Sequence, residues 1–115
     1  MILAVLDDLM FSVKIKTAAK TLGAEVYFER SPGSALDTIR AKAPTLVIFD
    51  LDSVKMKPVD TVAAMKADPA LCEIPTLGFV SHVHADTIAA ARAAGIDQVL
   101  ARSAFVDRLG SILAP

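Results

Sequence analysis

Four acidic residues stand directly after two apolar runs of the sequence. Asp7 and Asp8 close the first run, and Asp50, with Asp52 two residues on, closes the second. Carboxylates at the carboxyl ends of parallel strands lie where open α/β sheets bind ligands. Because carboxylates that converge in one crevice repel one another, such a site favours a hard cation such as Mg²⁺. The spacing predicts an acidic pocket, although Asp is also common at strand ends and as a helix N-cap.

These two apolar runs belong to a series of five predicted strands. Each is short, rich in apolar residues and bounded by Gly, Pro or polar residues. The run over residues 45–49 is the most strongly apolar, which predicts a central strand. The predicted strands cover residues 2–6, 24–28, 45–49, 76–80 and 97–101.

A helical pattern follows each predicted strand. Apolar residues from Phe11 to Leu22 recur at helical spacing, and Gly23 predicts the end of that helix. Ser31 and Pro32 predict the N-cap and the first turn of the second helix. The predicted helices cover about residues 11–22, 32–42, 59–67, 85–94 and 104–113.

The alternation of strands and helices predicts one domain over residues 1–115. Its fold class is α/β, with a single doubly wound, flavodoxin-like (βα)5 architecture and right-handed crossovers. The default strand order is 2-1-3-4-5, which puts the ends of the first and third strands side by side. Asp7, Asp8 and Asp50 are therefore expected to be neighbours in one crevice.

The composition excludes several classes of function. Twelve basic and 13 acidic residues give a net charge of −1, which offers no electrostatic case for nucleic acid or an anionic membrane. The absence of Trp disfavours a stacking platform for single-stranded nucleic acid. No apolar run approaches the length that spans a bilayer, and the start lacks a basic signal-peptide region. The single Cys72 cannot form an internal disulfide, which fits a cytoplasmic location.

The chain resembles a response-regulator receiver domain of the CheY-like family over essentially its whole length. The resemblance rests on the Asp7-Asp8 pair, on Asp50, on Pro75, and on Gly95 with the strand that follows it. It implies a role in two-component or phosphorelay signalling. The expected role is that of a switch and not of an enzyme, with at most self-phosphorylation and dephosphorylation at an aspartate.

The resemblance also implies a separate role for each acidic residue. Asp50 would be the nucleophile that accepts a phosphoryl group from a phosphohistidine or a small phosphodonor. Mg²⁺ would be bound by Asp8, Asp50 and the backbone carbonyl of Asp52, while Asp7 would hold a metal-bound water.

The positions that would complete the switch depart from the family pattern. Val80 stands where the family has Thr or Ser, and Ser81 comes one residue late. Val99 stands where many members carry an aromatic residue, and Arg102 replaces a Lys. Ser81 and Arg102 remain candidates for the phosphate pocket, and Arg102 is also a candidate cation for pairing with Asp50.

Three classes of function remain. The first is a receiver that is phosphorylated on Asp50 with Mg²⁺. The second is a phosphorylation-independent pseudo-receiver that works as a docking module, with Arg102 as a built-in cation bonded to Asp50. The third, a flavin- or nucleotide-binding protein, is disfavoured because the loops after the first and third strands lack the glycines that cradle a phosphate.

Output through a protein partner is expected in either receiver hypothesis. The partner would be a histidine kinase or an output protein, or a second copy of the chain. The expected surface is the face built from the fourth helix, the fifth strand and the last helix. Its basic residues are Arg92, Arg102 and Arg108.

Two weaker signals have ordinary explanations. His82, His84 and Asp86 show a spacing found in metal sites, but two imidazoles without a third strong ligand are typical of a polar loop. Asp86 is then an N-cap or an acid of the first helical turn. Cys72 lies in a predicted loop, and a redox role is disfavoured.

Overall fold

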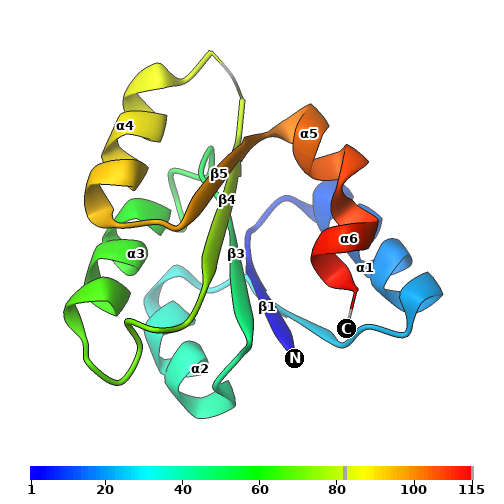
Figure 1. Cartoon of the computed structure of the whole chain (residues 1–115), viewed down its shortest axis with the longest axis horizontal. Coiled ribbons are helices and arrows are strands. Elements are labelled where there is room, and N and C mark those ends of the chain that lie inside the picture. The colour runs from blue at the N-terminus through cyan, green and yellow to red at the C-terminus, as the bar shows by residue number, and fades with distance from the viewer. Residues whose placement is uncertain (82, 115) are drawn as a thin grey trace.

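The chain forms one five-stranded parallel sheet in the order β2-β1-β3-β4-β5, shown in Figure 1. This computed structural model describes residues 1–81 and 83–114. The strand order confirms the predicted doubly wound α/β fold. The strands are β1 (Ile2–Val5), β2 (Val26–Glu29), β3 (Leu46–Asp50), β4 (Thr76–Val80) and β5 (Gln98–Ala101).

Helices cover both faces of the sheet (Figure 1). One apolar cluster joins the sheet to α1, α5 and α6, and the other joins it to α2, α3 and α4. No helix in the described part of the chain is long and apolar enough to cross a membrane. The helices are α1 (Leu9–Leu22), the 3₁₀ turn η1 (Pro32–Ser34), α2 (Ala35–Lys42), α3 (Pro58–Ala67), α4 (Ala85–Ala94), α5 (Arg102–Asp107) and α6 (Leu109–Leu113).

Alternating side chains of the central strands fill the two clusters. In β1, Leu3 and Val5 face the α2–α4 side, while Ile2 and Ala4 face the side of α1, α5 and α6. Since both faces are covered, the strand reads as a continuous apolar run in the sequence. The charged residues are thereby confined to the strand ends, where the loops leave the sheet.

The second strand begins later than predicted. Gly23 adopts the left-handed conformation with φ 69°, and the N–H of Ala24 donates to the carbonyl of Ala19 at 2.9 Å. These bonds close the C-terminus of α1. Ala24 therefore belongs to the helix end, and β2 starts at Val26.

Two helices also differ from the predicted ones. Ser31 has extended backbone angles, but its side chain makes no capping hydrogen bond, and a 3₁₀ turn precedes α2. The predicted last helix is divided at Arg108, whose φ and ψ are −97° and 3°, and Gly110 in α6 lowers the helical propensity after that break. Its first half begins at Arg102 because β5 leads into α5 without a loop.

Candidate functional site

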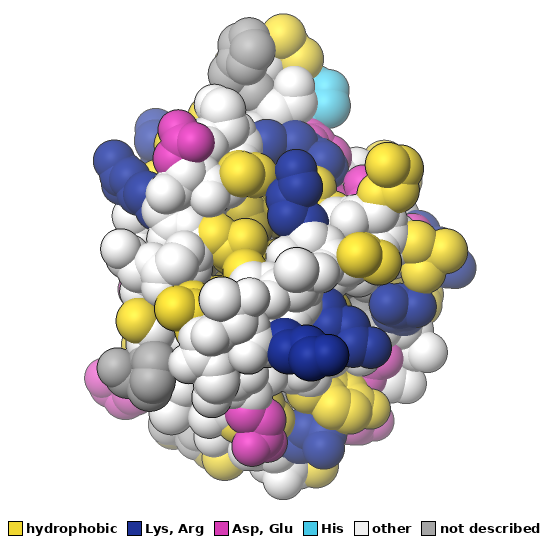
Figure 2. Space-filling view, turned by 90° about the vertical axis from the view of Figure 1, so that its right-hand side faces the viewer, with side chains coloured by type: hydrophobic (Ala, Val, Ile, Leu, Met, Phe, Trp, Pro, Cys, Tyr) yellow, Lys and Arg dark blue, Asp and Glu magenta, His cyan; other side chains and the backbone are white. Residues whose placement is uncertain are grey.

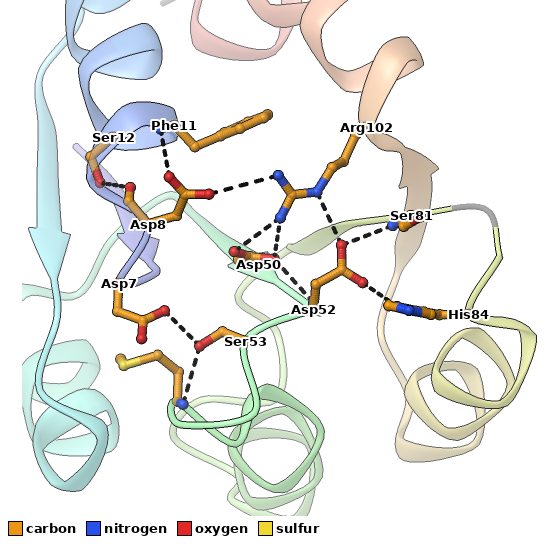
Figure 3. A network of polar contacts seen from close by, with 11 residues as sticks. Asp7, Asp8, Phe11, Ser12, Asp50, Asp52, Ser53, Ser81, His84 and Arg102 are labelled. Carbon is orange, nitrogen blue, oxygen red and sulfur yellow. Dashed lines mark hydrogen bonds and ion pairs between the residues drawn. The ribbon is translucent and has the colours of Figure 1, made fainter.

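The predicted site residues meet at the carboxyl edge of the sheet. Asp50 is the last residue of β3, Asp7 and Asp8 follow β1, Ser81 follows β4, and Arg102 follows β5 directly. Because these four strands are neighbours and parallel, their ends open onto one crevice. Figure 3 shows these side chains around the guanidinium of Arg102.

Arg102 lies at the centre of the acidic pocket. Its Nη2 donates to both carboxylate oxygens of Asp50, at 3.2 and 3.3 Å, and its Nε donates to Asp52 Oδ2 at 3.0 Å. Its Nη1 is 3.8 Å from Asp8 Oδ2. One planar guanidinium therefore faces three carboxylates, which a compact ammonium could not do with the same geometry. This arrangement agrees with the predicted pairing of Arg102 with Asp50.

The carboxylate of Asp52 has a larger part in the pocket than the sequence suggested. The sequence assigned only its backbone carbonyl. In the structure, its side chain accepts hydrogen bonds from Arg102 Nε, from the Ser81 N–H at 2.9 Å, and from His84 Nδ1 at 2.6 Å. Its own N–H donates to Asp50 Oδ1 at 3.0 Å. Asp52 thus joins the ends of β3 and β4, the start of α5 and the start of α4.

The paired acids after β1 are held in different ways. Asp7 Oδ1 accepts a hydrogen bond from the Ser53 hydroxyl at 2.7 Å, on the side of the pocket away from Arg102 (Figure 3). Asp8 is the N-cap of α1, and its Oδ1 accepts from the N–H of Phe11 at 3.0 Å. Asp8 therefore has the helix-capping role that Asp often has at the start of a helix. Ser53 was not predicted, since only the fold brings it to Asp7.

The two central carboxyls are shifted in opposite directions. Burial raises the pKa of Asp50, and this exceeds the lowering by the Arg102 charge and by the N–H of Asp52. For Asp52, partial burial raises the pKa, but the hydrogen bonds from His84, from the Ser81 N–H and from Arg102 together hold it below its ordinary value.

The guanidinium of Arg102 lies over the rings of Phe11 and Phe79. Its guanidinium carbon is 4.9 Å from the ring centre of Phe11 and 5.3 Å from that of Phe79. Phe79 stacks between Phe11 and Phe105, with a centroid distance of 4.6 Å to each. Aromatic faces attract a guanidinium, so these rings help to fix its position over the sheet.

In the observed arrangement of their side chains, the acidic residues leave no place for a magnesium ion. Their chemistry suits a hard cation, but a guanidinium lies between Asp8 and Asp50, where a bridging ion would have to bind. Within residues 1–81 and 83–114, no three Asp, Glu, His or Cys side chains gather so as to hold a metal. The predicted Mg²⁺ site, with Asp7, Asp8, Asp50 and the Asp52 carbonyl, stays a prediction.

The two positions that differ from the family's switch residues, Val80 and Val99, have apolar surroundings as well as apolar side chains. Val80 is 1% exposed and belongs to the cluster on the α2–α4 side, and Val99 packs against the same cluster. Ser81 contributes its backbone N–H to Asp52. The polar contact that the strand end makes with the pocket therefore runs through the main chain.

Two of the three residues with the weak metal-site spacing, His84 and Asp86, lie within the described part of the chain. His84 is the N-cap residue of α4, makes no capping hydrogen bond, and turns its ring to Asp52. Asp86 lies in the first turn of α4, as one of its two predicted roles required. His82 lies outside the described residues. Cys72 is a partly exposed free thiol in the predicted loop.

The three basic residues of the predicted partner face differ in their surroundings. Arg92 and Arg108 are exposed, whereas Arg102 turns into the pocket. Figure 2 views the side of the molecule that lies at the right of Figure 1, and it shows exposed hydrophobic side chains beside Lys and Arg. The most exposed large apolar residues of α1 are Leu9, Met10 and Val13.

Comparison with known proteins finds its matches among solved structures. No protein-family model and no curated protein sequence matches the chain. The phosphorylated cyanobacterial phytochrome response regulator RcpA is 26% identical, with a TM-score of 0.80 over 97% of this chain and 86% of that one. The response regulator from Hahella chejuensis is 20% identical, with a TM-score of 0.84 over 97% and 90% of the two chains.

A metal-bound relative of the same fold is also similar. The Mn²⁺-bound form of the response regulator Rcp1 is 19% identical, with a TM-score of 0.80 over 96% of this chain and 89% of that one. These similarities agree with the strand order of the sheet. The chain therefore has the fold of a CheY-like response-regulator receiver domain, as the sequence resemblance predicted.

Proposed function

We propose that the chain is a receiver-type signal-transduction module whose acidic pocket is neutralised by its own Arg102. It works through contacts with other proteins, without bound metal and without phosphorylation. Residues 1–115 act in this proposal as one receiver domain and not as an enzyme. The observation that carries the proposal is the set of contacts from one guanidinium to Asp8, Asp50 and Asp52.

The state of Asp50 supports this proposal. The residue is 3% exposed, and both of its carboxylate oxygens accept hydrogen bonds from Arg102. Oδ1 also accepts the N–H of Asp52. A carboxylate that attacks phosphorus needs a reactive oxygen lone pair and a path for the donor; the three hydrogen bonds lower the nucleophilicity of the oxygens, and the burial of Asp50 restricts the path. In addition, Val80 offers no hydroxyl to hold a phosphoryl group.

The partners and the surface that they use are part of the same proposal. A histidine kinase or an output protein would contact the face of α4, β5 and the last helix, now α5 and α6, where Arg92 and Arg108 are exposed. A second copy of the chain is the other candidate. Since Arg102 is bound in the pocket, its loss should change a partner interaction only through the conformation of the pocket.

A second candidate function is phosphoryl acceptance on Asp50. It is favoured by the position of Asp50 at the end of β3, with Asp7 and Asp8 at the end of the adjacent β1. In that case an Asp50 oxygen would form the new bond to phosphorus as the donor group leaves, and Arg102 would have to release that oxygen. The phosphorylated relative RcpA is consistent with this candidate at the level of fold.

The wild-type chain should gain no stability from Mg²⁺. An ion that binds only the folded state raises the free energy of unfolding by about 1.4 kcal/mol at ten times its dissociation constant. Because Arg102 lies between the carboxylates, we expect no change in the wild-type chain at millimolar Mg²⁺, measured by urea denaturation against NaCl of equal ionic strength.

The Arg102→Met variant is the matched control for this titration. It leaves three carboxylates without the guanidinium, so the same Mg²⁺ concentrations should stabilise it measurably. A clear stabilisation of the wild-type chain, equal to that of the variant, would overturn the claim that Arg102 takes the place of a metal ion.

A further inference from the structure

Among the described residues, the side chain of Asp52 connects the start of α4 to the acidic pocket. Asp52 Oδ2 accepts the N–H of Ser81, and Asp52 Oδ1 accepts from the ring of His84. The same Oδ2 accepts from Arg102 Nε. Figure 3 shows Asp52 between Arg102 on one side and the turn that leads into α4 on the other.

Helix α4 buries few side chains. Within α4, all of whose residues are described, Ala91 is fully buried, and Ile88 and Ala94 pack partly buried against the apolar cluster on the α2–α4 side. The side chain of the N-cap residue His84 makes no capping hydrogen bond and is bonded to Asp52 instead. A helix with few buried side chains lies toward the low end of local stability, so the bonds at its first turn contribute to holding it.

The bonds continue from Asp52 into the helix. Ser81 O accepts the N–H of His84 at 3.1 Å, and His84 O accepts the N–H of Ile88 at 3.1 Å. A change at Asp52 therefore reaches the first turn of α4 through three successive hydrogen bonds. Among the residues that the structure describes, the side chain of Asp50 has no hydrogen bond to this turn, because its partners are Arg102 and the N–H of Asp52.

We infer that Asp52 is a positioning residue that couples the position of Arg102 to the conformation of the β4–α4 turn and the first turn of α4. When Arg102 is bound to Asp52, the carboxylate is fixed and the turn is held. When Arg102 is withdrawn, the carboxylate loses its charge-assisted partner and the turn loosens. This main-chain link replaces the side-chain hydroxyl that Val80 lacks, and it rests on the Arg102-filled pocket of the proposed function.

Amide hydrogen exchange in the folded protein tests this coupling. Asp52→Asn and Asp50→Asn are matched variants, because both remove one carboxylate charge that Arg102 contacts, and only Asp52 also contacts Ser81 and His84. We expect exchange at the Ser81 and His84 amides to rise roughly tenfold or more in Asp52→Asn. In Asp50→Asn it should stay within about twofold of wild type. Each rate is taken relative to that of the buried Ile48 amide, which corrects for any change in global stability.

Variants of Arg102 supply the second half of the test. Arg102→Lys keeps a positive charge near Asp50 but cannot present the same fork to two carboxylates, so it should raise exchange at the same two amides. Combining it with Asp52→Asn should add little, because both act on one link. The coupling is refuted if Arg102→Lys leaves these amides at wild-type rates, or if Asp50→Asn affects them as strongly as Asp52→Asn.

The two proposals fail in different experiments. Mg²⁺ binding by the wild-type chain would refute the proposed function, while the exchange rates would still show whether Asp52 holds the turn. Conversely, unchanged amide exchange in Asp52→Asn would refute the coupling, and it would not affect the proposal that Arg102 neutralises the pocket.

Discussion

Replacing Arg102 with methionine should lower the free energy of unfolding at pH 7 by about 3 kcal/mol or more. Asp50 is 3% exposed, and without the guanidinium its buried charge would have no counter-charge. Methionine keeps an apolar stem over Phe11 and Phe79, so the loss reports on the charge and not on the packing. Urea denaturation followed by far-UV circular dichroism measures the change.

The double variant with Asp50→Asn separates this cause from others. Asparagine removes the uncompensated charge, so Arg102→Met with Asp50→Asn should recover most of the lost stability. Asp50→Asn alone should cost far less than Arg102→Met, because Arg102 retains Asp52 and Asp8. If the double variant is as unstable as Arg102→Met, the buried charge is not the reason for the loss.

The deficit of Arg102→Met should shrink as the pH falls from 7 towards about 4. Burial raises the pKa of Asp50 above its unfolded value, so keeping it ionised costs stability above that pKa, and protonation relieves the cost as the pH falls. The pKa of Asp52 is held below its ordinary value, so its stabilising contribution, which Arg102 shares, persists down to about pH 4 and is lost only below that pH. Protonation of Asp50 is therefore the effect that brings the variant and the wild type together between pH 7 and about 4.

Replacing Phe79 with alanine should have the other large effect, a loss of about 3–5 kcal/mol in the free energy of unfolding. The ring is 0% exposed, lies in β4 and stacks between Phe11 and Phe105. Its removal leaves a cavity between the sheet and the helices and takes away one of the two faces under Arg102. Urea denaturation of the two proteins gives the difference directly.

Tyr27→Ala is the matched aromatic control. Tyr27 lies in the edge strand β2, is 43% exposed, and packs its ring under Lys42 at the surface. Its truncation should cost clearly less than that of Phe79. If the two variants lose equal amounts of unfolding free energy, the stack of Phe11, Phe79 and Phe105 does not make a special contribution to stability.

The topology could be predicted because it depends on patterns that the sequence carries locally. Short apolar runs separated by helical periodicity require a covered parallel sheet, and this alone brings Asp8, Asp50 and Arg102 to one edge. The errors lie at the ends of elements. The start of β2 and the break at Arg108 depend on main-chain hydrogen bonds and local backbone angles, which side-chain periodicity does not report.

The structure brings the predicted acidic residues, Ser81 and Arg102 to one edge of the sheet, but the contacts of Ser53 and His84 with this pocket were not predicted. The resemblance to receiver domains, in which Arg102 replaces a Lys, indicated Arg102 as a cation for Asp50, and the structure places the two in contact. It could not indicate that the Asp52 carboxylate would contact Ser81 and His84, because those contacts depend on how the β3–α3 and β4–α4 turns meet. The three-residue spacing from Ser81 to His84 is the one local signal that could have suggested a turn closing over the pocket.

The most direct test of the central claim is the intact mass of the protein after incubation with acetyl phosphate and Mg²⁺. The wild-type chain and Asp50→Asn are treated in parallel. If Arg102 neutralises the pocket and Asp50 is not a phosphoacceptor, neither protein gains mass. A gain of one phosphoryl group by the wild-type chain, absent from Asp50→Asn, would contradict the account and establish Asp50 as a working phosphoacceptor.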